Sequence, residues 1–258
     1  MTRYAMITGA SSGLGLALAE ALARRGRNLI LVARQRETLE PVAIELTQRF
    51  GVEVLLRACD LSQPLRLSGF VLELEEGERR IDLLVNCAGQ RTYGPFLAHE
   101  WADEQDLLEV NVLAMSRLCH AIGNLMAVQG GGQILNVAGL AGVAPGPWMA
   151  AYAASKAYVL SFSEALREEL RRTGIKVSVL CPGPVRSSRR RIPRLDNSSP
   201  SPEEIALYTV RALDKNQTLI LPGRRNRWLA FAPRLLPRWL ARKLAGVIHR
   251  RYCPVDVQ

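Results

Sequence analysis

A tyrosine and a lysine four positions apart have the clearest chemical potential in this chain. They occur in the segment Tyr152-Ala-Ala-Ser155-Lys156, and residues i and i+4 of a helix lie on the same face. A phenol with a pKa near 10 is a poor proton shuttle at neutral pH. A nearby ammonium group lowers that pKa, so Tyr152 is expected to act as an acid or a base. Such a pair taken alone is usually a surface contact, so its meaning depends on the rest of the chain.

A glycine-rich turn near the N-terminus supplies a second candidate site. A short apolar run ends in Thr8-Gly9-Ala10-Ser11-Ser12-Gly13-Leu14-Gly15, and a helical pattern follows. Glycines let the backbone turn sharply and approach a pyrophosphate, and a helix N-terminus offers it free N–H groups and a positive dipole. We therefore predict a dinucleotide-binding turn, whose contact residues are Gly9, Ser11, Ser12, Gly13, Leu14 and Gly15.

The residues after the second apolar run indicate which dinucleotide is bound. An acidic residue there would hydrogen-bond the ribose hydroxyls of NAD. The sequence instead has Arg34 and Arg36, which can pair with the 2′-phosphate of NADP. NADP(H) is therefore favoured over NAD, and the alternative is that both arginines are solvated loop charges. Asp60 and Leu61 follow the third run and are expected near the adenine.

The sequence predicts alternating strands and helices, which would position these residues. Short runs rich in Val, Ile and Leu alternate with amphipathic segments such as 14–25 and 155–172. The pattern predicts a Rossmann-like, doubly wound parallel sheet with helices on both faces. We expect a dinucleotide-binding and catalytic domain at 1–223 and a basic amphipathic extension at 224–258. The predicted strands are 4–8, 28–33, 52–59, 82–86, 133–138, 176–181 and 218–221.

The amino-acid composition indicates the class of protein and its cellular location. The chain has 258 residues, 48% hydrophobic and 22% charged, which suits one globular α/β domain. Its five cysteines include no CxxC pair, and its three histidines form no ligand motif, so no disulfide framework or metal site is expected. No signal peptide or membrane span is visible. A cytoplasmic location is the simplest expectation.

Taken together, the motifs resemble those of the short-chain dehydrogenase/reductase family. The resemblance covers about residues 1–221, and it implies a seven-stranded sheet and hydride transfer between an alcohol and a carbonyl. It also implies homodimers or homotetramers that form through helices around 103–126 and 152–171. The matching residues are TGASSGLG at 8–15, Asp60, NCAG at 86–89, Asn111, Tyr152, Lys156 and Pro182-Gly183-Pro184-Val185.

The resemblance implies a role for each residue of the catalytic group. Tyr152 would donate a proton to a carbonyl undergoing reduction, and Lys156 would bind the nicotinamide ribose and tune Tyr152. Asn111 would hold a water that links Lys156 to solvent. Further cofactor contacts would come from Asn86, Ala88, Gly89, Pro182, Gly183, Val185 and Ser187.

One position departs from the family pattern. The family has a catalytic serine thirteen residues before the tyrosine, where this chain has Gly139. Losing a hydroxyl that holds the substrate oxygen is expected to cost a factor on the order of 10²–10³ in rate. Either activity persists at a reduced level, with a substrate group, a water or another side chain in the gap, or the protein is a cofactor-binding scaffold or sensor with little turnover.

The positive charge is concentrated at the C-terminus. Residues 1–214 contain 24 basic and 23 acidic residues, whereas residues 215–255 contain ten basic and no acidic residues. Within 224–252, stripes of arginine and leucine lie at helical spacing, and Pro233 and Pro237 suggest two short helices. Two interpretations are equally favoured, namely peripheral contact with a membrane surface and packing on the body or a partner subunit. No nucleic-acid-binding module is recognisable, so no nucleic acid is expected.

A second basic run follows the sixth predicted strand, where ligands bind in sheets of this type. Five arginines lie between positions 186 and 194. They indicate either an anionic substrate or, as the favoured interpretation, a solvated charge run. The sequence does not identify the substrate.

Overall fold

The computed structural model describes most of the chain. The described residues are 2–77, 79–186, 199–223, 226–230, 237, 239–240, 242–243 and 245–246. Ser187, most of the arginine run at 186–194 and much of the extension therefore lie outside the described residues.

The described residues form a seven-stranded parallel sheet with the order β3-β2-β1-β4-β5-β6-β7, which confirms the predicted fold. The strand order reverses between β1 and β4, and ligands bind outside the carboxyl ends of strands at such a point. The strands are β1 (Arg3–Thr8), β2 (Asn28–Ala33), β3 (Val54–Ala58), β4 (Arg80–Asn86), β5 (Gly132–Val137), β6 (Ile175–Leu180) and β7 (Leu219–Ile220).

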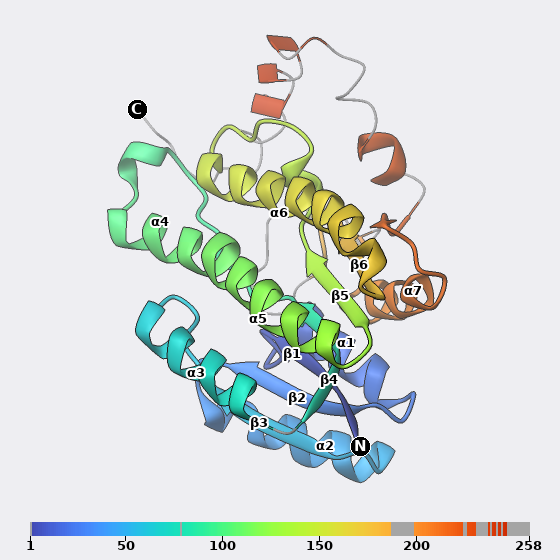
Figure 1. Cartoon of the computed structure of the whole chain (residues 1–258). Helices are drawn as coiled ribbons and strands as arrows, with labels where there is room; N and C mark the ends of the chain where they lie inside the picture. The colour runs from blue at the N-terminus through green and yellow to red at the C-terminus, as the bar shows by residue number, and fades with distance from the viewer. Residues whose placement is uncertain are drawn as a thin grey trace.

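Helices cover both faces of the sheet (Figure 1). One face packs against α1 (Gly13–Ala23), α2 (Glu40–Phe50) and α7 (Pro202–Asp214). The other packs against α3 (Pro64–Glu76), α5 (Met115–Val128) and α6 (Ala150–Glu169). The chain reaches α5 through α4 (Trp101–Leu108) and the π-helical segment η3 (Glu109–Ala114). Four 3₁₀ turns complete the described elements: η1 (Arg36–Thr38), η2 (Phe96–Ala98), η4 (Leu140–Gly142) and η5 (Leu170–Arg172).

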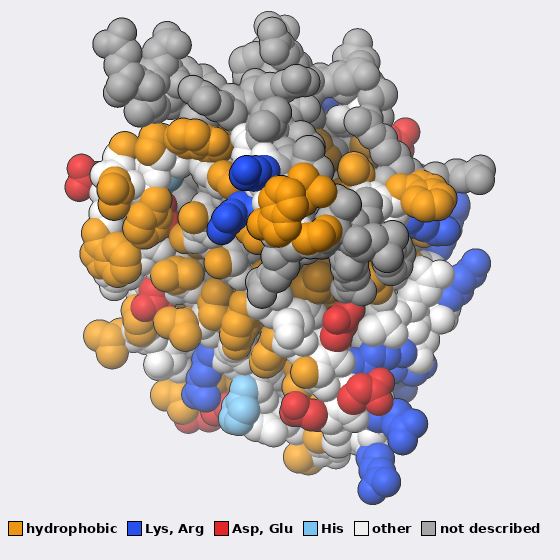
Figure 2. Space-filling view, turned by 90° about the horizontal axis from the view of Figure 1, so that it is seen from above, with side chains coloured by type: hydrophobic (Ala, Val, Ile, Leu, Met, Phe, Trp, Pro, Cys, Tyr) orange, Lys and Arg blue, Asp and Glu red, His pale blue; other side chains and the backbone are white. Residues whose placement is uncertain are grey.

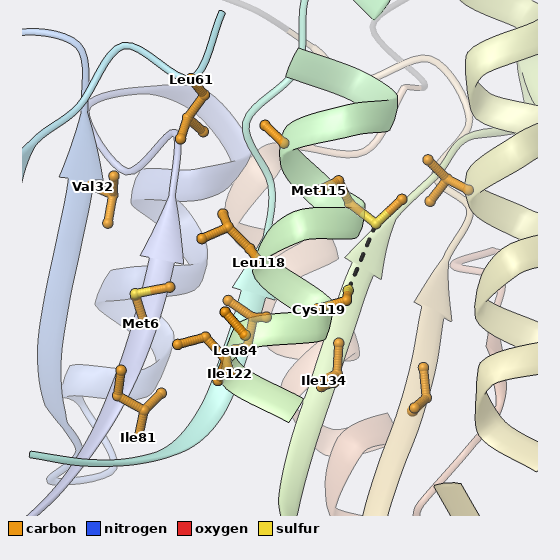
Figure 3. Close-up of a cluster of buried hydrophobic side chains, with 14 of the residues drawn as sticks. Met6, Val32, Leu61, Ile81, Leu84, Met115, Leu118, Cys119, Ile122 and Ile134 are labelled. Carbon is orange, nitrogen blue, oxygen red and sulfur yellow. Dashed lines mark hydrogen bonds between the residues drawn. The ribbon is translucent and has the colours of Figure 1, made fainter. Parts of the chain in front are cut away.

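Alternation along the strands divides the core into two layers. Met6 of β1 and Leu84 of β4 face α5, where they meet Leu118 and Ile122 (Figure 3). Their chain neighbours Ile7 and Val85 belong to the opposite layer, which is packed against α1 and α7. Because both faces are covered, most strands contain a short apolar run, and these runs are the signal from which the strands could be predicted.

The first described residues of the C-terminal extension pack on the domain. Ala230 is only 5% exposed and contacts the layer that holds α5 and α6. Asn226 donates a hydrogen bond to the carbonyl oxygen of Pro222. The extension therefore begins as part of the body. Among the described residues, none of the helices has the length and apolar character needed to span a bilayer.

Candidate active site

The turn after β1 has the geometry that phosphate binding requires. Gly9 has a φ of +69°, and its N–H donates to the carbonyl oxygen of Val32. A Cβ atom on Gly15 would lie 2.2 Å from the carbonyl oxygen of Gly9, so only glycine allows α1 to approach this closely. The Ser12 side chain, at the N-cap, makes no capping hydrogen bond. The Ser12 side chain thus leaves the first N–H groups of α1 uncapped.

Thr8 joins this turn to the one that follows β4. Its hydroxyl oxygen accepts hydrogen bonds from the N–H groups of Cys87 and Ala88, each at 3.0 Å. A Cβ atom on Gly9 would lie 2.9 Å from the Ala88 Cα atom. On Gly89, a Cβ atom would come within 3.5 Å of the Lys156 Nζ atom. The structure thus brings the predicted cofactor turn close to the predicted catalytic lysine.

The side chain of Asn86 points into the protein and away from this turn. It is buried, and its amide donates to the Asn136 side chain at 2.9 Å and to the Cys119 sulfur at 3.3 Å. The Asn136 amide in turn donates to the Ser163 hydroxyl at 3.0 Å. This network joins β4, β5, α5 and α6 below the site. The sequence analysis missed this network. Its signal in the sequence is that two strands, which prove to be adjacent, each have an asparagine near their end.

Helix α6 places Tyr152 and Lys156 together, as the spacing predicts. Lys156 is 6% exposed, and its ammonium group donates to the Val137 carbonyl oxygen at 2.9 Å. The Nζ atom lies 5.8 Å from the centroid of the Tyr152 ring. Val137 ends β5, so the sheet fixes the position of the lysine.

Burial changes the pKa of both groups. It lowers the pKa of Lys156 to about 8. It raises the pKa of Tyr152, an effect that the charge of Arg91 only partly offsets. The direction of this shift is opposite to the one expected from the Tyr152–Lys156 spacing, because desolvation outweighs the charge of Arg91. Tyr152 stays protonated at neutral pH, the form needed to donate a proton.

Asn111 lies in the π-helical segment and fixes a loop against α6. Its side-chain oxygen accepts from the Gln90 N–H at 2.8 Å, and its amide donates to the Gln90 carbonyl at 2.9 Å and the Ser155 hydroxyl at 3.0 Å. The Ser155 hydroxyl donates to the Tyr152 carbonyl at 2.7 Å. The proton of the Ser155 hydroxyl is thus already donated to a backbone carbonyl. Single π turns inside helices are frequent at functional sites.

Gly139 follows the end of β5 by two residues and leaves room for a side chain. Its backbone is extended, with a φ of 165° and a ψ of 160°, which any residue adopts. A Cβ atom there would find its nearest neighbour, the Pro182 carbonyl oxygen, at 3.8 Å. In contrast, a Cβ atom on Gly142 would lie 2.4 Å from the Lys156 backbone. The backbone therefore requires glycine at 142 but not at 139.

The remaining predicted cofactor residues lie around the carboxyl ends of the strands. Arg34 is exposed at the end of β2, and Arg36 pairs with Glu40 at 3.2 Å. Asp60 accepts hydrogen bonds from the Ser62 N–H and hydroxyl, so its carboxylate shapes its own turn. Leu61 is buried in the core.

The turn that starts at Pro182 is held from two sides. Its Pro182 carbonyl accepts from the Leu140 N–H at 3.0 Å. A Cβ atom on Gly183 would lie 2.6 Å from the Asn226 side-chain oxygen, so the extension contacts this turn directly. Val185 is half-buried against the layer that holds α1 and α7.

The pKa of Lys156 leads to a prediction about stability. Its folded-state pKa of about 8 lies below the ordinary 10.5, so the buried charge destabilises the fold below about pH 8. This destabilisation disappears as the pH rises from about 8 to 10.5. We therefore expect Lys156→Met to raise the melting temperature of the cofactor-free protein at pH 7 by at least about 2 °C. The gain should shrink at pH 10.

Thermal unfolding followed by circular dichroism at several pH values checks this prediction. Lys215→Met is the matched control, since Lys215 is exposed, and it should leave the melting temperature nearly unchanged. A gain from Lys156→Met that is the same at pH 7 and pH 10 would show that the burial of charge is not its cause.

Comparison with known proteins assigns the chain to a family. The sequence profile of the short chain dehydrogenases matches residues 3–196, and the chain belongs to this family of oxidoreductases. It is 32% identical over 219 residues to the ketoacyl reductase HetN of Nostoc sp., covering 83% of this chain and 75% of HetN. The structure of a short-chain dehydrogenase from Sphingobium yanoikuyae in complex with NADPH matches with a TM-score of 0.81 and 30% identity, and the match covers 100% of this chain and 98% of that chain.

A third relative is informative because of its name. The inactive hydroxysteroid dehydrogenase-like protein 1 of Rattus norvegicus is 34% identical over 220 residues, which cover 82% of this chain and 66% of that protein. The similarity of this chain therefore extends both to a protein named as a reductase and to one named as inactive.

Proposed function

We propose that this protein is an NADP(H)-dependent oxidoreductase that interconverts a carbonyl and an alcohol. One observation carries the proposal: Tyr152 and Lys156 share a face of α6, beside the glycine turn that exposes the N-terminus of α1. The NADPH-bound structure from Sphingobium yanoikuyae supports the choice of cofactor. When bound, NADPH supplies the hydride.

The residues of the candidate active site fit NADP(H). The turn from Gly9 to Gly15 is close-packed and offers backbone N–H groups to the pyrophosphate. Lys156 would bind the nicotinamide ribose, and the Pro182–Val185 turn would support the nicotinamide ring. Ala88 and Gly89 lie between the turn after β1 and Lys156, where they would contact the cofactor. Asn86 would contact the cofactor only through its backbone, because its side chain is engaged in the buried network.

Tyr152 would act as the proton donor during reduction. The carbonyl carbon gains the hydride and the carbonyl oxygen takes the proton of the phenol, which yields the alcohol and leaves a tyrosinate. The ammonium group of Lys156 would stabilise that tyrosinate, and a proton from solvent would restore the phenol. Asn111 keeps Gln90 and Ser155 in place. It would also hold a water that links Lys156 to solvent.

A second candidate function is a cofactor-binding scaffold or sensor with little turnover. Gly139, which removes the usual hydroxyl, favours it, as does the similarity to a relative named as inactive. NADPH consumption over a panel of ketones, aldehydes and quinones separates the two candidates. Turnover of any compound supports the enzyme, whereas tight NADPH binding without turnover across the panel supports the scaffold.

The preference for NADP(H) is tested at Arg34. Because Arg36 is engaged with Glu40, Arg34 is the stronger candidate for pairing with the 2′-phosphate. We expect Arg34→Ala to raise the Kd of NADPH about tenfold, the size of one charge-assisted contact, and to change the Kd of NADH less than about twofold. Fluorescence titration measures both constants. Arg24→Ala removes an exposed arginine at the far end of α1 as a control, and equal effects on NADPH and NADH would contradict the assignment.

We infer that the chain forms homodimers or homotetramers through the helices around 103–126 and 152–171, which are α4, η3, α5 and α6. Leu113 in the adjoining η3 segment is 55% exposed and Tyr158 of α6 is 40% exposed. The Tyr158 hydroxyl lies 3.0 Å from the Ser116 hydroxyl, which ties the two helices together on this face. A small-molecule carbonyl or alcohol remains the expected substrate, and a cytoplasmic location the expected setting.

We also propose that the extension binds anionic membrane surfaces. Trp228 is 79% exposed and Trp239 is 56% exposed, and Lys243 lies over the Trp239 ring. Figure 2, which views the side toward which the strands run, shows exposed apolar side chains together with lysine and arginine side chains. Aromatic and basic residues in this combination suit the interface of an anionic bilayer.

This membrane contact can be tested by flotation with anionic vesicles. Replacing Arg242 and Lys243 by glutamine is expected to lower the vesicle partition coefficient at least about tenfold, since each basic residue contributes about 1 kcal/mol. The same replacement at the exposed residues Arg171 and Arg172 is the control. Binding that is unchanged in the first variant, or equally weakened in both, would remove the proposal.

A further inference from the structure

A row of basic residues crosses the edge of the sheet at which the strands begin, opposite the candidate active site. Arg3 begins β1 and Arg80 begins β4, and the two are register partners on adjacent strands. Arg27 immediately precedes β2, whose first residue pairs with Tyr4. Lys176 continues the row on β6, where it pairs with Gln133 of β5. Like charges on neighbouring strands repel one another, so this row calls for an explanation.

These residues line an open groove of about 310 Å³. Four of its lining residues are basic, and the single acidic one, Asp82, pairs with Arg27. The rest of the lining is largely backbone, from glycines at 130–132 and at 174. A Cβ atom on Gly131, whose φ is +112°, would lie 2.6 Å from the Gly174 carbonyl oxygen. Glycine therefore keeps the groove free of side chains at this point.

The basic side chains in the groove have unused hydrogen-bonding capacity. The Nε atoms of Arg27 and Arg80 are buried and have no hydrogen-bond partner within the described residues. A second nitrogen of Arg80 donates to the Gln129 carbonyl at 3.1 Å, which fixes the direction of that side chain. An anion in the groove would relieve the repulsion between the cations and would accept hydrogen bonds from Arg3 and Lys176, which are exposed.

We propose that this groove is a binding site for a small anion that carries phosphate groups. Guanidinium groups match the geometry of phosphate oxygens, and Lys176 adds a further positive charge at the exposed end of the row. The volume falls within the range of small-molecule sites. The site lies at the end of the sheet where the strands begin, near the N-terminus in Figure 1, and is therefore separate from the dinucleotide turn at the other end.

Isothermal titration with pyrophosphate tests the proposal. The protein is first saturated with NADPH, so that the glycine turn after β1 does not compete for pyrophosphate. The titration is run at low ionic strength, because salt screens the attraction between charges. Replacing Arg3 and Lys176 by alanine removes two exposed charges without opening the core. We expect this variant to bind pyrophosphate at least about tenfold more weakly than the unaltered chain.

A matched variant removes two charges elsewhere. Arg211 and Lys215 are exposed in and just after α7, outside the groove, and replacing both by alanine should leave the affinity for pyrophosphate unchanged. Amide chemical shifts provide a second measurement, with the largest changes expected at residues 130–132 and 174. No binding to the unaltered chain, equal weakening in both variants, or shifts confined to the glycine turn after β1 would each overturn the proposal.

Discussion

Replacing Tyr152 by phenylalanine is expected to lower kcat about 10²–10⁴-fold, the usual contribution of a positioned proton donor. The ring remains, so the contact with the buried Lys156 and the packing of α6 should persist. The Kd of NADPH should change little, because Tyr152 acts on the substrate oxygen. Steady-state kinetics on a compound from the panel, together with NADPH titration, measures both quantities.

The matched control lies on the same helix. Tyr158→Phe also removes one phenol from α6, but that hydroxyl is exposed and contacts only Ser116 among the partners seen in the described residues. Its kcat should remain within about twofold of the unaltered enzyme, a change of under half a kcal/mol. If both variants kept full activity, another group would have to be the proton donor.

Restoring a hydroxyl at Gly139 is expected to raise kcat/KM on the order of 10²–10³-fold, the value of one donor aimed at the substrate oxygen. The site accepts the change, because the backbone is extended and the nearest atom to a new Cβ would be 3.8 Å away. Gly139→Ser should therefore fold normally, and kinetics on the compound used for Tyr152→Phe measures the gain.

Gly139→Ala separates the hydroxyl from the added bulk. It introduces the Cβ atom without a donor, so it should leave kcat/KM within about threefold, under 1 kcal/mol. If serine and alanine both lowered the rate, a part of the substrate would have to occupy the space beside Gly139. That result would contradict the interpretation of Gly139 as a simple loss of a donor.

The elements of the site that depend on local sequence were predictable. The glycine turn follows from residues 8–15 and their place between a strand and a helix, and the Tyr152–Lys156 face follows from helical periodicity. Both depend on residues close together in the chain, where backbone geometry leaves few alternatives.

Features that depend on distant segments were not predictable in the same way. Asn86 and Asn136 meet because β4 and β5 are neighbours, a fact that neither local pattern contains. The direction of the Tyr152 pKa shift depends on total burial, which only the folded chain defines. The contact of Asn226 with Gly183 likewise depends on β6 and β7 being neighbours in the sheet.

The measurement closest to the central claim follows the fate of the hydride. NADPH deuterated at the transferring position is incubated with the protein and a carbonyl compound from the panel, and the product is examined by mass spectrometry. The proposed function predicts one deuterium on the carbonyl carbon of the alcohol, and almost none with Tyr152→Phe. Tight binding of NADPH without any deuterated alcohol, across the whole panel, would contradict it.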